Sequence, residues 1–492
     1  MKRLLPALLL LIACCTTRAQ APAVRGFHID LRIQVMKMPA LKQLALQLSQ
    51  QGINTLVMEW EGAYPFETEP VIPNRYAYTR SEVTDFIHYC DSLHMDVIPL
   101  QQSFGHVEYI LRYPRYAALR EDSRDYSQVC PSQLAANKAL FTKLFKEMAA
   151  THHSPYIHIG CDETHLLGHC PLCQQRAKNR GVSKLYFDHV KMLCDIVISL
   201  GKIPVLWADI ALKYPEYLQQ LPKQAVLVDW NYGWALDRFG DHRKLLQSGY
   251  QIWGSPALRS DPDNYFYTGW QRHFNNIHDF VPTTRQLGYK GIVMTSWSTS
   301  GEYDAVFNAT GDLTDLYPVR NVYPISGFNM LIAAFLQSVH QVQALNTDSF
   351  ITRYCQEQYG LDAATAAGFR RALFCAKPGT QGLDSAEWSA RILHAMQPTK
   401  HADEFEHYRL MADVRVYYLR YNAIEAALNK DDHPDLAKYA AQLKALMDTE
   451  PALRETFTRL NDRVLYPSAI ENENEIRCYK THQLYARLTR TR

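Results

Sequence analysis

Short apolar runs alternate with longer amphipathic segments between residue 27 and about residue 300. The short runs are β-rich, as buried strands are, and the longer segments repeat apolar residues at helical spacing. The short runs are 27–31, 55–59, 96–101, 156–160, 203–207, 226–230, 250–254 and 291–296, and the clearest helical segments are 37–50, 81–93, 134–150 and 184–200. Eight strands alternating with helices over roughly 280 residues predict an α/β fold, a (β/α)₈ TIM barrel.

The strand pattern disappears after about residue 330. Helical patterns cover 329–342, 363–374, 386–396, 402–428 and 435–447. Breakers such as Gln397-Pro398 and His433-Pro434 separate several of them. We therefore expect three parts: a signal segment over 1–20, a barrel domain over 21–325, and a C-terminal α-helical domain over 326–492.

The N-terminus is typical of an export signal. Basic residues at positions 2 and 3 precede an apolar run that ends at Ala13 and is too short to span a bilayer. The run leads directly into Cys14, as in bacterial lipoproteins, whereas cleavage after Ala19 is the alternative. We expect an exported bacterial protein, periplasmic or at the outer membrane or cell surface, whose membrane contact is a lipid anchor at Cys14.

The composition restricts the class of partner. Fifty-two Lys and Arg residues against 50 Asp and Glu residues leave a net charge of +2, and no long like-charge run suggests a nucleic-acid partner. Thirty Tyr and eight Trp residues could supply the flat faces that sugar sites need, although most aromatic rings belong to cores. The cysteines beyond Cys14 and Cys15 are nine in number and scattered, which is not a disulfide framework.

Polar or aromatic side chains gather where the predicted strands end. Because barrel active sites form at the C-terminal ends of the strands, these side chains are the candidates for a site. They are Asp30, Arg32, Glu59, His106, His158, Asp162, Glu163, Trp207, Asp209, Asp229, Trp230, Trp253 and Trp297.

The adjacent pair Asp162-Glu163 is the strongest candidate for chemistry. Consecutive strand residues point to opposite faces, so both carboxylates reach one site only where the chain leaves regular strand geometry. A neighbouring carboxylate and a partly apolar pocket would raise the pKa of one of them and let it act as an acid near neutral pH. The alternative is an acidic pair on a solvated loop.

Several motifs in this order carry a resemblance to a known family. They are the segments 27–32, 76–78, 97–101, 104–108, 158–163 (His-Ile-Gly-Cys-Asp-Glu), 205–207, 229–230 and 291–297. Over about residues 24–305 the chain resembles the family 20 glycoside hydrolases, the β-N-acetylhexosaminidases, and within them the hexosaminidase D branch. The resemblance implies a retaining exo-enzyme that removes terminal β-linked GlcNAc or GalNAc without a cofactor.

The resemblance also implies residue roles. The substrate's 2-acetamido oxygen would be the nucleophile, Glu163 the general acid and later base, and Asp162 the partner of the acetamido nitrogen. Trp207, Trp230 and Trp297 would wall the sugar pocket. Tyr232 or Tyr303 would donate a hydrogen bond to the acetamido oxygen, and we favour Tyr232. His106, His158, Asp30, Arg32, Glu59, Asp209, Asp229 and Trp253 are further candidates for substrate binding, although Arg32 follows Asp30 by two positions where relatives often have three.

A second cluster lies just after the acidic pair. His165, His169, Cys170 and Cys173 include a Cys-x-x-Cys motif, which is compatible with zinc, a disulfide or free thiols. A second, separated pair of ligands and the HExxH motif are both missing from the sequence, which argues against zinc. The reaction that the resemblance implies uses no metal. The alternative functions are a non-catalytic glycan-binding barrel and a zinc-dependent hydrolase that uses this cluster.

Overall fold

The computed structural model describes residues 22–299 and 321–490. Within them, eight parallel strands follow the chain around a closed barrel, because β1 pairs with both β2 and β11. The strands are β1 Val24–Asp30, β2 Thr55–Glu59, β3 Asp96–Leu100, β6 Tyr156–His158, β7 Ile203–Trp207, β8 Val226–Trp230, β9 Gln251–Ser255 and β11 Gly291–Ser296. The predicted barrel is therefore confirmed.

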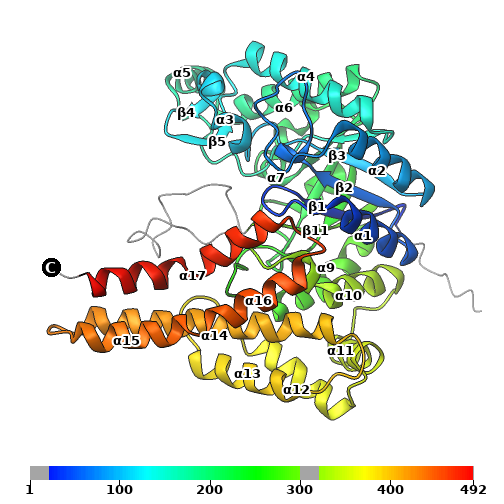
Figure 1. Cartoon of the computed structure of the whole chain (residues 1–492). Coiled ribbons are helices and arrows are strands. Elements are labelled where there is room, and N and C mark those ends of the chain that lie inside the picture. The colour runs from blue at the N-terminus through cyan, green and yellow to red at the C-terminus, as the bar shows by residue number, and fades with distance from the viewer. Residues whose placement is uncertain (1–21, 300–320, 491–492) are drawn as a thin grey trace, which may run out of the picture.

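Helices surround the barrel (Figure 1). The longer ones are α1 Met38–Gln50, α2 Arg80–Ser92, α4 Leu134–Thr151, α6 Val182–Ser199, α9 Trp270–Gln286 and α10 Asn329–His340, and the shorter ones are α3 Glu108–Leu111, α5 Pro171–Arg180, α7 Asp209–Lys213 and α8 His242–Gln247. Local sequence fixes their ends. For example, Thr79 and Glu82 form a reciprocal capping box that satisfies the first amides of α2.

Three short strands were not predicted. β4 Arg120–Asp122 and β5 Asp125–Val129 form a hairpin in the connection between β3 and β6, and β10 Ala257–Arg259 pairs beside β11. The hairpin lies against the segment that follows β3, since the amide of Val129 donates to the carbonyl of Phe104 at 3.0 Å. The hairpin therefore belongs to the C-terminal end of the barrel, where the candidate site lies.

The barrel interior is filled by side chains rather than open. Branched residues from several strands, including Val57, Ile98, Val205 and Val293, form one buried cluster. The same cluster continues into the aromatic residues that follow the strands, such as Trp297. The core of the barrel thus supports the floor of the candidate site.

The C-terminal helices lie along one side of the barrel, coloured yellow to red in Figure 1. They are α11 Thr347–Tyr354, α12 Ala363–Phe374, α13 Leu383–Ala395, α14 Ala402–Lys430, α15 Leu436–Met447, α16 Glu450–Asn461 and α17 Pro467–Thr489, and α11, α16 and α17 were not predicted. Among the described residues, no helix combines the length and the apolar character needed to cross a bilayer.

Helix α10 packs on the barrel. Arg285 at the end of α9 donates to the carbonyl of Val339 at 3.0 Å, and the ring of His340 lies 3.2 Å from the carbonyl of Gln51 at the end of α1. These contacts place α10 between α9 and α1. A domain boundary at residue 325 assigns α10 to the helical part, and that boundary stays a prediction.

The helical part also supports the first loop of the barrel. Gln34, which follows β1, donates to Glu473 of α17 at 3.0 Å and accepts a hydrogen bond from Arg259 at 2.8 Å. The backbone amide of Lys37 donates to the carbonyl of Val464 at 2.7 Å. The loop that carries Arg32 is therefore held from both sides.

Candidate active site

A cavity of about 280 Å³ opens at the C-terminal end of the barrel strands. Its walls come from loops or strand ends that follow β1, β3, β6, β7, β8, β10 and β11. The lining residues are Arg32, His106, Asp162, Glu163, Trp207, Trp230, Tyr232, Trp234, Arg238, Ser260, Asp261, Trp297 and Thr299. This is the end of a TIM barrel at which enzymes of this architecture carry their chemistry.

The backbone after β6 explains how two consecutive carboxylates reach one cavity. Strand β6 ends at His158, and Gly160, Cys161 and Glu163 then adopt φ angles of 68°, 77° and 46°. Left-handed backbone is costly for Cys and Glu, and such strain concentrates at functional sites. The chain thus leaves strand geometry at this point, and Asp162 and Glu163 both line the cavity.

Two glycines allow the close approaches that hold this turn. A Cβ atom on Gly160 would lie 1.9 Å from the side-chain oxygen of Gln102, and one on Gly105 would lie 2.4 Å from the carbonyl oxygen of Asp162. A larger residue at Gly105 would clash with backbone, and one at Gly160 would displace the Gln102 side chain and be strained by its positive φ. The segment after β3 and the segment after β6 are therefore packed directly on each other.

His106 contacts both carboxylates. Its Nε2 lies 3.4 Å from Oδ2 of Asp162 and 3.2 Å from Oε2 of Glu163. Burial disfavours the imidazolium, but the charge of Asp162 and the hydrogen bonds to both carboxylates outweigh burial and raise the pKa of His106 well above its ordinary value. In the free site the imidazolium form of His106 is therefore favoured.

The acid expected at Glu163 is ionised in this free site, which corrects the sequence-based expectation of a raised pKa in the pair. Burial raises the pKa of Glu163, but the hydrogen bond and charge of His106 outweigh it and lower the pKa to about 2. The nearest carboxyl with a raised pKa is that of Asp209. Burial and the charge of Asp162 raise the pKa of Asp209 to about 7, and Asp209 accepts the backbone N–H of Glu163 at 3.2 Å.

Several buried polar atoms around the cavity have no hydrogen-bond partner among the described residues. They include Oδ1 of Asp162, Nε1 of Trp230 and Oγ1 of Thr299. A buried polar atom is nearly always paired in a native protein. These atoms therefore mark positions at which a polar ligand can complete the site.

Aromatic side chains form one wall. The indole N–H of Trp297 donates to the hydroxyl of Tyr232 at 2.9 Å, and Thr295 is a second hydrogen-bonding neighbour of that hydroxyl. The rings of Trp207 and Trp297 lie 5.9 Å apart, and the rings of Trp230 and Tyr232 lie 5.0 Å apart. Aromatic faces of this kind pack against the apolar face of a sugar ring.

A charged network lies behind Arg32. Nε of Arg32 is 3.2 Å from Asp30, and its guanidinium lies 5.0 Å from the ring centre of Trp297. Burial opposes ionisation of Asp30, but Arg32 and His28 together lower its pKa. Glu59 lies 2.9 Å from His28 and 3.8 Å from Arg32. Asp30 and Glu59 thus orient Arg32 from beneath, rather than lining the cavity themselves.

Besides Asp30 and Glu59, four more of the predicted binding residues do not line the cavity. His158 lies behind Trp207 with ring centres 4.4 Å apart, and Asp209 lies beneath Glu163. The carboxylate of Asp229 binds His242 at 2.7 Å and Tyr289 at 2.6 Å, both in the outer layer. Trp253 is fully buried and pairs in register with Gly291, the first residue of β11, so it lies toward the opposite end of the barrel. Tyr303 lies outside the described residues.

Five lining residues were not predicted: Trp234, Arg238, Ser260, Asp261 and Thr299. The first two come from the long segment after β8, and the guanidinium of Arg238 stacks 4.3 Å from the ring centre of Trp234. Burial raises the pKa of Asp261. In the sequence, the five residues are distinguished only by following a strand end, and many other polar residues do the same.

Comparisons with known proteins agree with this geometry. The family model "Glycosyl hydrolase family 20, catalytic domain" matches residues 29–312. The chain is 25% identical over 291 residues to "Hexosaminidase D" of Bos taurus, covering 56% of this chain and 84% of that protein. It is 28% identical over 302 residues to "Hexosaminidase D" of Homo sapiens, covering 58% and 62%.

Among solved structures, the chain is similar to the crystal structure of a beta-N-acetylhexosaminidase from Bacteroides fragilis NCTC 9343. The TM-score is 0.53 at 17% sequence identity, over 68% of this chain and 70% of that chain. At this identity the similarity supports the barrel fold.

Proposed function

This chain belongs to glycosyl hydrolase family 20 and is a glycoside hydrolase, and we propose that it is a retaining exo-β-N-acetylhexosaminidase acting on terminal β-linked GlcNAc or GalNAc. The observation that carries the proposal is the Asp162–Glu163 pair, joined by His106 in an aromatic-walled cavity. A cavity of about 280 Å³ is small for a ligand pocket and suits one terminal sugar, which favours exo action.

In the first step the substrate supplies the nucleophile. The oxygen of the 2-acetamido group attacks the anomeric carbon while the bond from that carbon to the leaving oxygen breaks. Glu163 gives its proton to the leaving oxygen, and the sugar becomes a bicyclic oxazolinium ion with its positive charge shared by the former amide nitrogen. The leaving group departs from one face while the acetamido group occupies the other.

Asp162 is suited to the acetamido nitrogen. Its Oδ2 contacts His106, but its Oδ1 is buried and lacks a protein partner among the described residues. That oxygen can accept the acetamido N–H, and its negative charge stabilises the positive charge that develops there. A preorganised charge in a partly desolvated site is the largest contribution to many enzymatic rate enhancements.

Tyr232 is suited to the acetamido oxygen. Because its hydroxyl oxygen already accepts the indole N–H of Trp297, its own proton can be donated to the acetamido oxygen and hold it toward the anomeric carbon. Trp207 and Trp297 would contact the acetamido methyl group, and Trp230 the sugar ring. Burial raises the pKa of Tyr232 well above its ordinary value, so the phenol keeps its proton.

In the second step water opens the oxazolinium ion. The Glu163 carboxylate removes one proton from the water as the water oxygen bonds to the anomeric carbon, and the acetamido group re-forms. Two displacements at one carbon retain the β configuration.

His106 can supply the proton that Glu163 needs as an acid. The two side chains lie 3.2 Å apart and share one proton, so a short transfer from the imidazolium of His106 gives the acid form of Glu163.

His106→Asn is expected to move the alkaline limb of the pH profile of kcat/KM to lower pH. In the wild type the His106–Glu163 pair holds the catalytic proton. Because the pKa of His106 is raised, the pair keeps this proton at pH values below that pKa and loses it as the pH rises through that pKa. In the variant a carboxyl alone must hold this proton, and carboxyls lose protons at lower pH. Substituting the exposed His278 to Asn should leave the profile unchanged, and a wild-type profile for His106→Asn would contradict proton sharing.

We also propose that the protein is exported and lipidated at Cys14, because the basic start and apolar run precede this cysteine directly. A mature protein whose N-terminal residue is a diacylated Cys14 is the expected product in a bacterial host, as measured by mass spectrometry. Recovery of a soluble mature chain that begins after Ala19 would contradict lipidation and favour ordinary secretion.

A further inference from the structure

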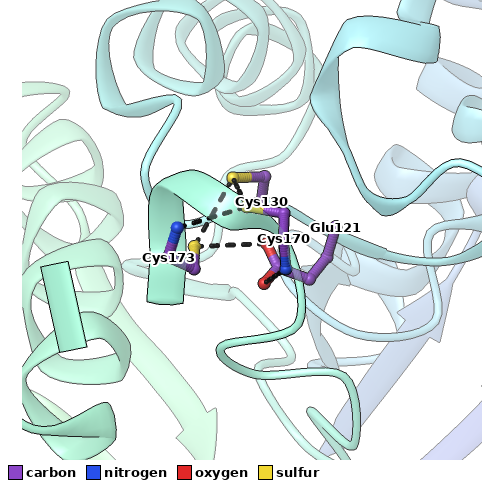
Figure 2. A group of neighbouring side chains, drawn as sticks. All are labelled: Glu121, Cys130, Cys170 and Cys173. Atoms are coloured by element: carbon purple, nitrogen blue, oxygen red, sulfur yellow. Dashed lines mark hydrogen bonds between the residues drawn. The ribbon is translucent and has the colours of Figure 1, made fainter. Parts of the chain in front are cut away.

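Four side chains of types that can ligate a metal converge away from the cavity. They are Glu121 of β4, Cys130 after β5, Cys170 at the N-terminus of α5, and Cys173 within α5, and one ligand atom from each lies within 4.8 Å of all the others. Figure 2 shows the three sulfur atoms and the Glu121 carboxylate pointing toward one another. The two histidines of the sequence-predicted cluster, His165 and His169, are not among the four.

The sulfur geometry matches a tetrahedral site. Sγ of Cys130 lies 3.4 Å from Sγ of Cys170 and 3.6 Å from Sγ of Cys173. Zinc–sulfur bonds of about 2.3 Å place the sulfurs of a tetrahedron roughly 3.8 Å apart, so small adjustments suffice. A disulfide would join only two of the three cysteines and leave the third thiol unpaired beside it.

Glu121 adds a buried carboxylate to the three sulfurs. The residue is only 2% exposed, and among the described residues no salt bridge joins Glu121 to a Lys, Arg or His side chain. Its oxygens accept the backbone N–H of Cys170 at 3.0 Å and the thiol of Cys173 at 3.2 Å. A buried carboxylate that pairs with no cationic side chain can ligate a divalent cation directly, beside the three sulfurs.

The surroundings are those of a thiolate site. The backbone N–H of Cys173 donates to Sγ of Cys170 at 3.3 Å, and the hydroxyl of Ser132 lies 2.9 Å from Sγ of Cys173. Cys170 is the N-cap of α5, so its sulfur faces the amides of the first turn of that helix. Outer-shell hydrogen bonds of this kind orient metal ligands.

We propose that Glu121, Cys130, Cys170 and Cys173 form a structural zinc site. Three thiolates and one carboxylate saturate a tetrahedral ion and leave no position open for water or substrate. Thiolate sulfur also selects zinc over calcium or magnesium. None of the four residues lines the catalytic cavity, so the ion takes no part in glycoside cleavage.

The site joins the two loops that carry the catalytic residues. Cys130 ends the hairpin that packs beside His106, where the amide of Val107 donates to the carbonyl of Ser127 at 3.2 Å. Cys170 and Cys173 begin the helix that follows Glu163. The ion therefore fastens the segment after β3 to the segment after β6, and it stabilises the 3.2 Å approach of His106 to Glu163.

The test begins with the metal content of the full-length chain, purified reduced and without chelators. One zinc ion per chain is expected, by mass spectrometry of the metal. Cys130→Ser and Cys173→Ser should each lose most of it, whereas Cys90→Ala and Cys194→Ala, which change buried cysteines outside the cluster, should retain it. Removal of zinc should lower the Tm of the wild type by several degrees, because the ion binds the folded chain.

A spectroscopic measurement covers the case in which the cysteine variants do not fold. Wild-type chain exchanged with Co²⁺ should show thiolate-to-cobalt charge-transfer bands and the intense visible bands of tetrahedral cobalt. A reduced wild-type chain that contains no zinc and gains none from added Zn²⁺ would overturn the proposal. So would a disulfide between Cys130 and Cys170 in the native chain, or immediate loss of turnover on chelation with the fold intact, which would make the ion catalytic.

Discussion

4-Nitrophenyl β-glucoside is expected to be cleaved about 10³-fold or more slowly, in kcat/KM, than 4-nitrophenyl β-GlcNAc, because a well-placed intramolecular nucleophile has an effective molarity of about 10⁵ M or more. The glucoside has a hydroxyl where the acetamido group would be, so bulk water or a poorly placed group must attack instead. It also lacks the methyl group that Trp207 and Trp297 would contact and the N–H that Oδ1 of Asp162 would accept.

Because the two substrates have the same leaving group, the difference in kcat/KM between them reports the effect of the acetamido group alone. The β-GalNAc analogue serves as a second positive substrate, because it keeps the acetamido group and changes one hydroxyl. Turnover of GlcNAc or GalNAc is required by the account. Comparable rates for the glucoside, or a glycosylated protein carboxylate trapped by mass spectrometry, would contradict it.

Glu163→Gln is expected to lower hydrolysis of natural glycosides by about 10²- to 10⁴-fold, the usual contribution of a general acid. The amide cannot donate the proton that an alkoxide leaving group needs. A dinitrophenyl glycoside should lose much less in the first step, because its leaving group departs without a proton. The measurement is kcat/KM for both classes of substrate.

Glu67→Gln is the matched control for this variant. Its carboxylate is 68% exposed and paired only distantly with Arg80 at 3.9 Å, so the change should leave both rates unaltered. Folding of Glu163→Gln is checked by its Tm. Wild-type turnover of a natural glycoside by a folded Glu163→Gln chain would remove Glu163 from the acid role.

The barrel could be predicted from sequence because its signal is periodic and repeated. Each of the eight strands is a short apolar run, and their order along the chain is their order around the barrel. The hairpin of β4 and β5 has no such signal, since Arg120–Asp122 is polar and only three residues long. Helices α16 and α17 were missed because their buried positions alternate with many charged ones.

Part of the cavity could be predicted from the rule that barrel strands end at the site. Asp162, Glu163, Trp207, Trp230 and Trp297 follow that rule and line the cavity. The rule fails for Asp229, because side chains alternate along a strand and its neighbours Val228 and Trp230 take the inward positions. It fails for Trp253 because the strands of a barrel are staggered, so that residue lies level with the start of β11.

The sequence pattern could not predict which residues far apart along the chain lie close together in the fold. Cys130 precedes Cys170 by forty residues, and only the folding of the hairpin onto the segment after β6 brings the two sulfurs within 3.4 Å. The protonation state of the pair was equally hidden. His106 lies more than fifty residues before Glu163, yet it decides which group carries the proton in the free site.

Fluorination of the substrate's acetamido group tests the central claim most directly. The series runs from N-acetyl to N-fluoroacetyl, N-difluoroacetyl and N-trifluoroacetyl β-glucosaminides with one leaving group. Each fluorine withdraws electrons from the amide oxygen and weakens it as a nucleophile, with little change in size. If this oxygen attacks the anomeric carbon, kcat/KM falls steeply and steadily along the series. A flat series would contradict substrate assistance and would place the nucleophile on the protein or in water.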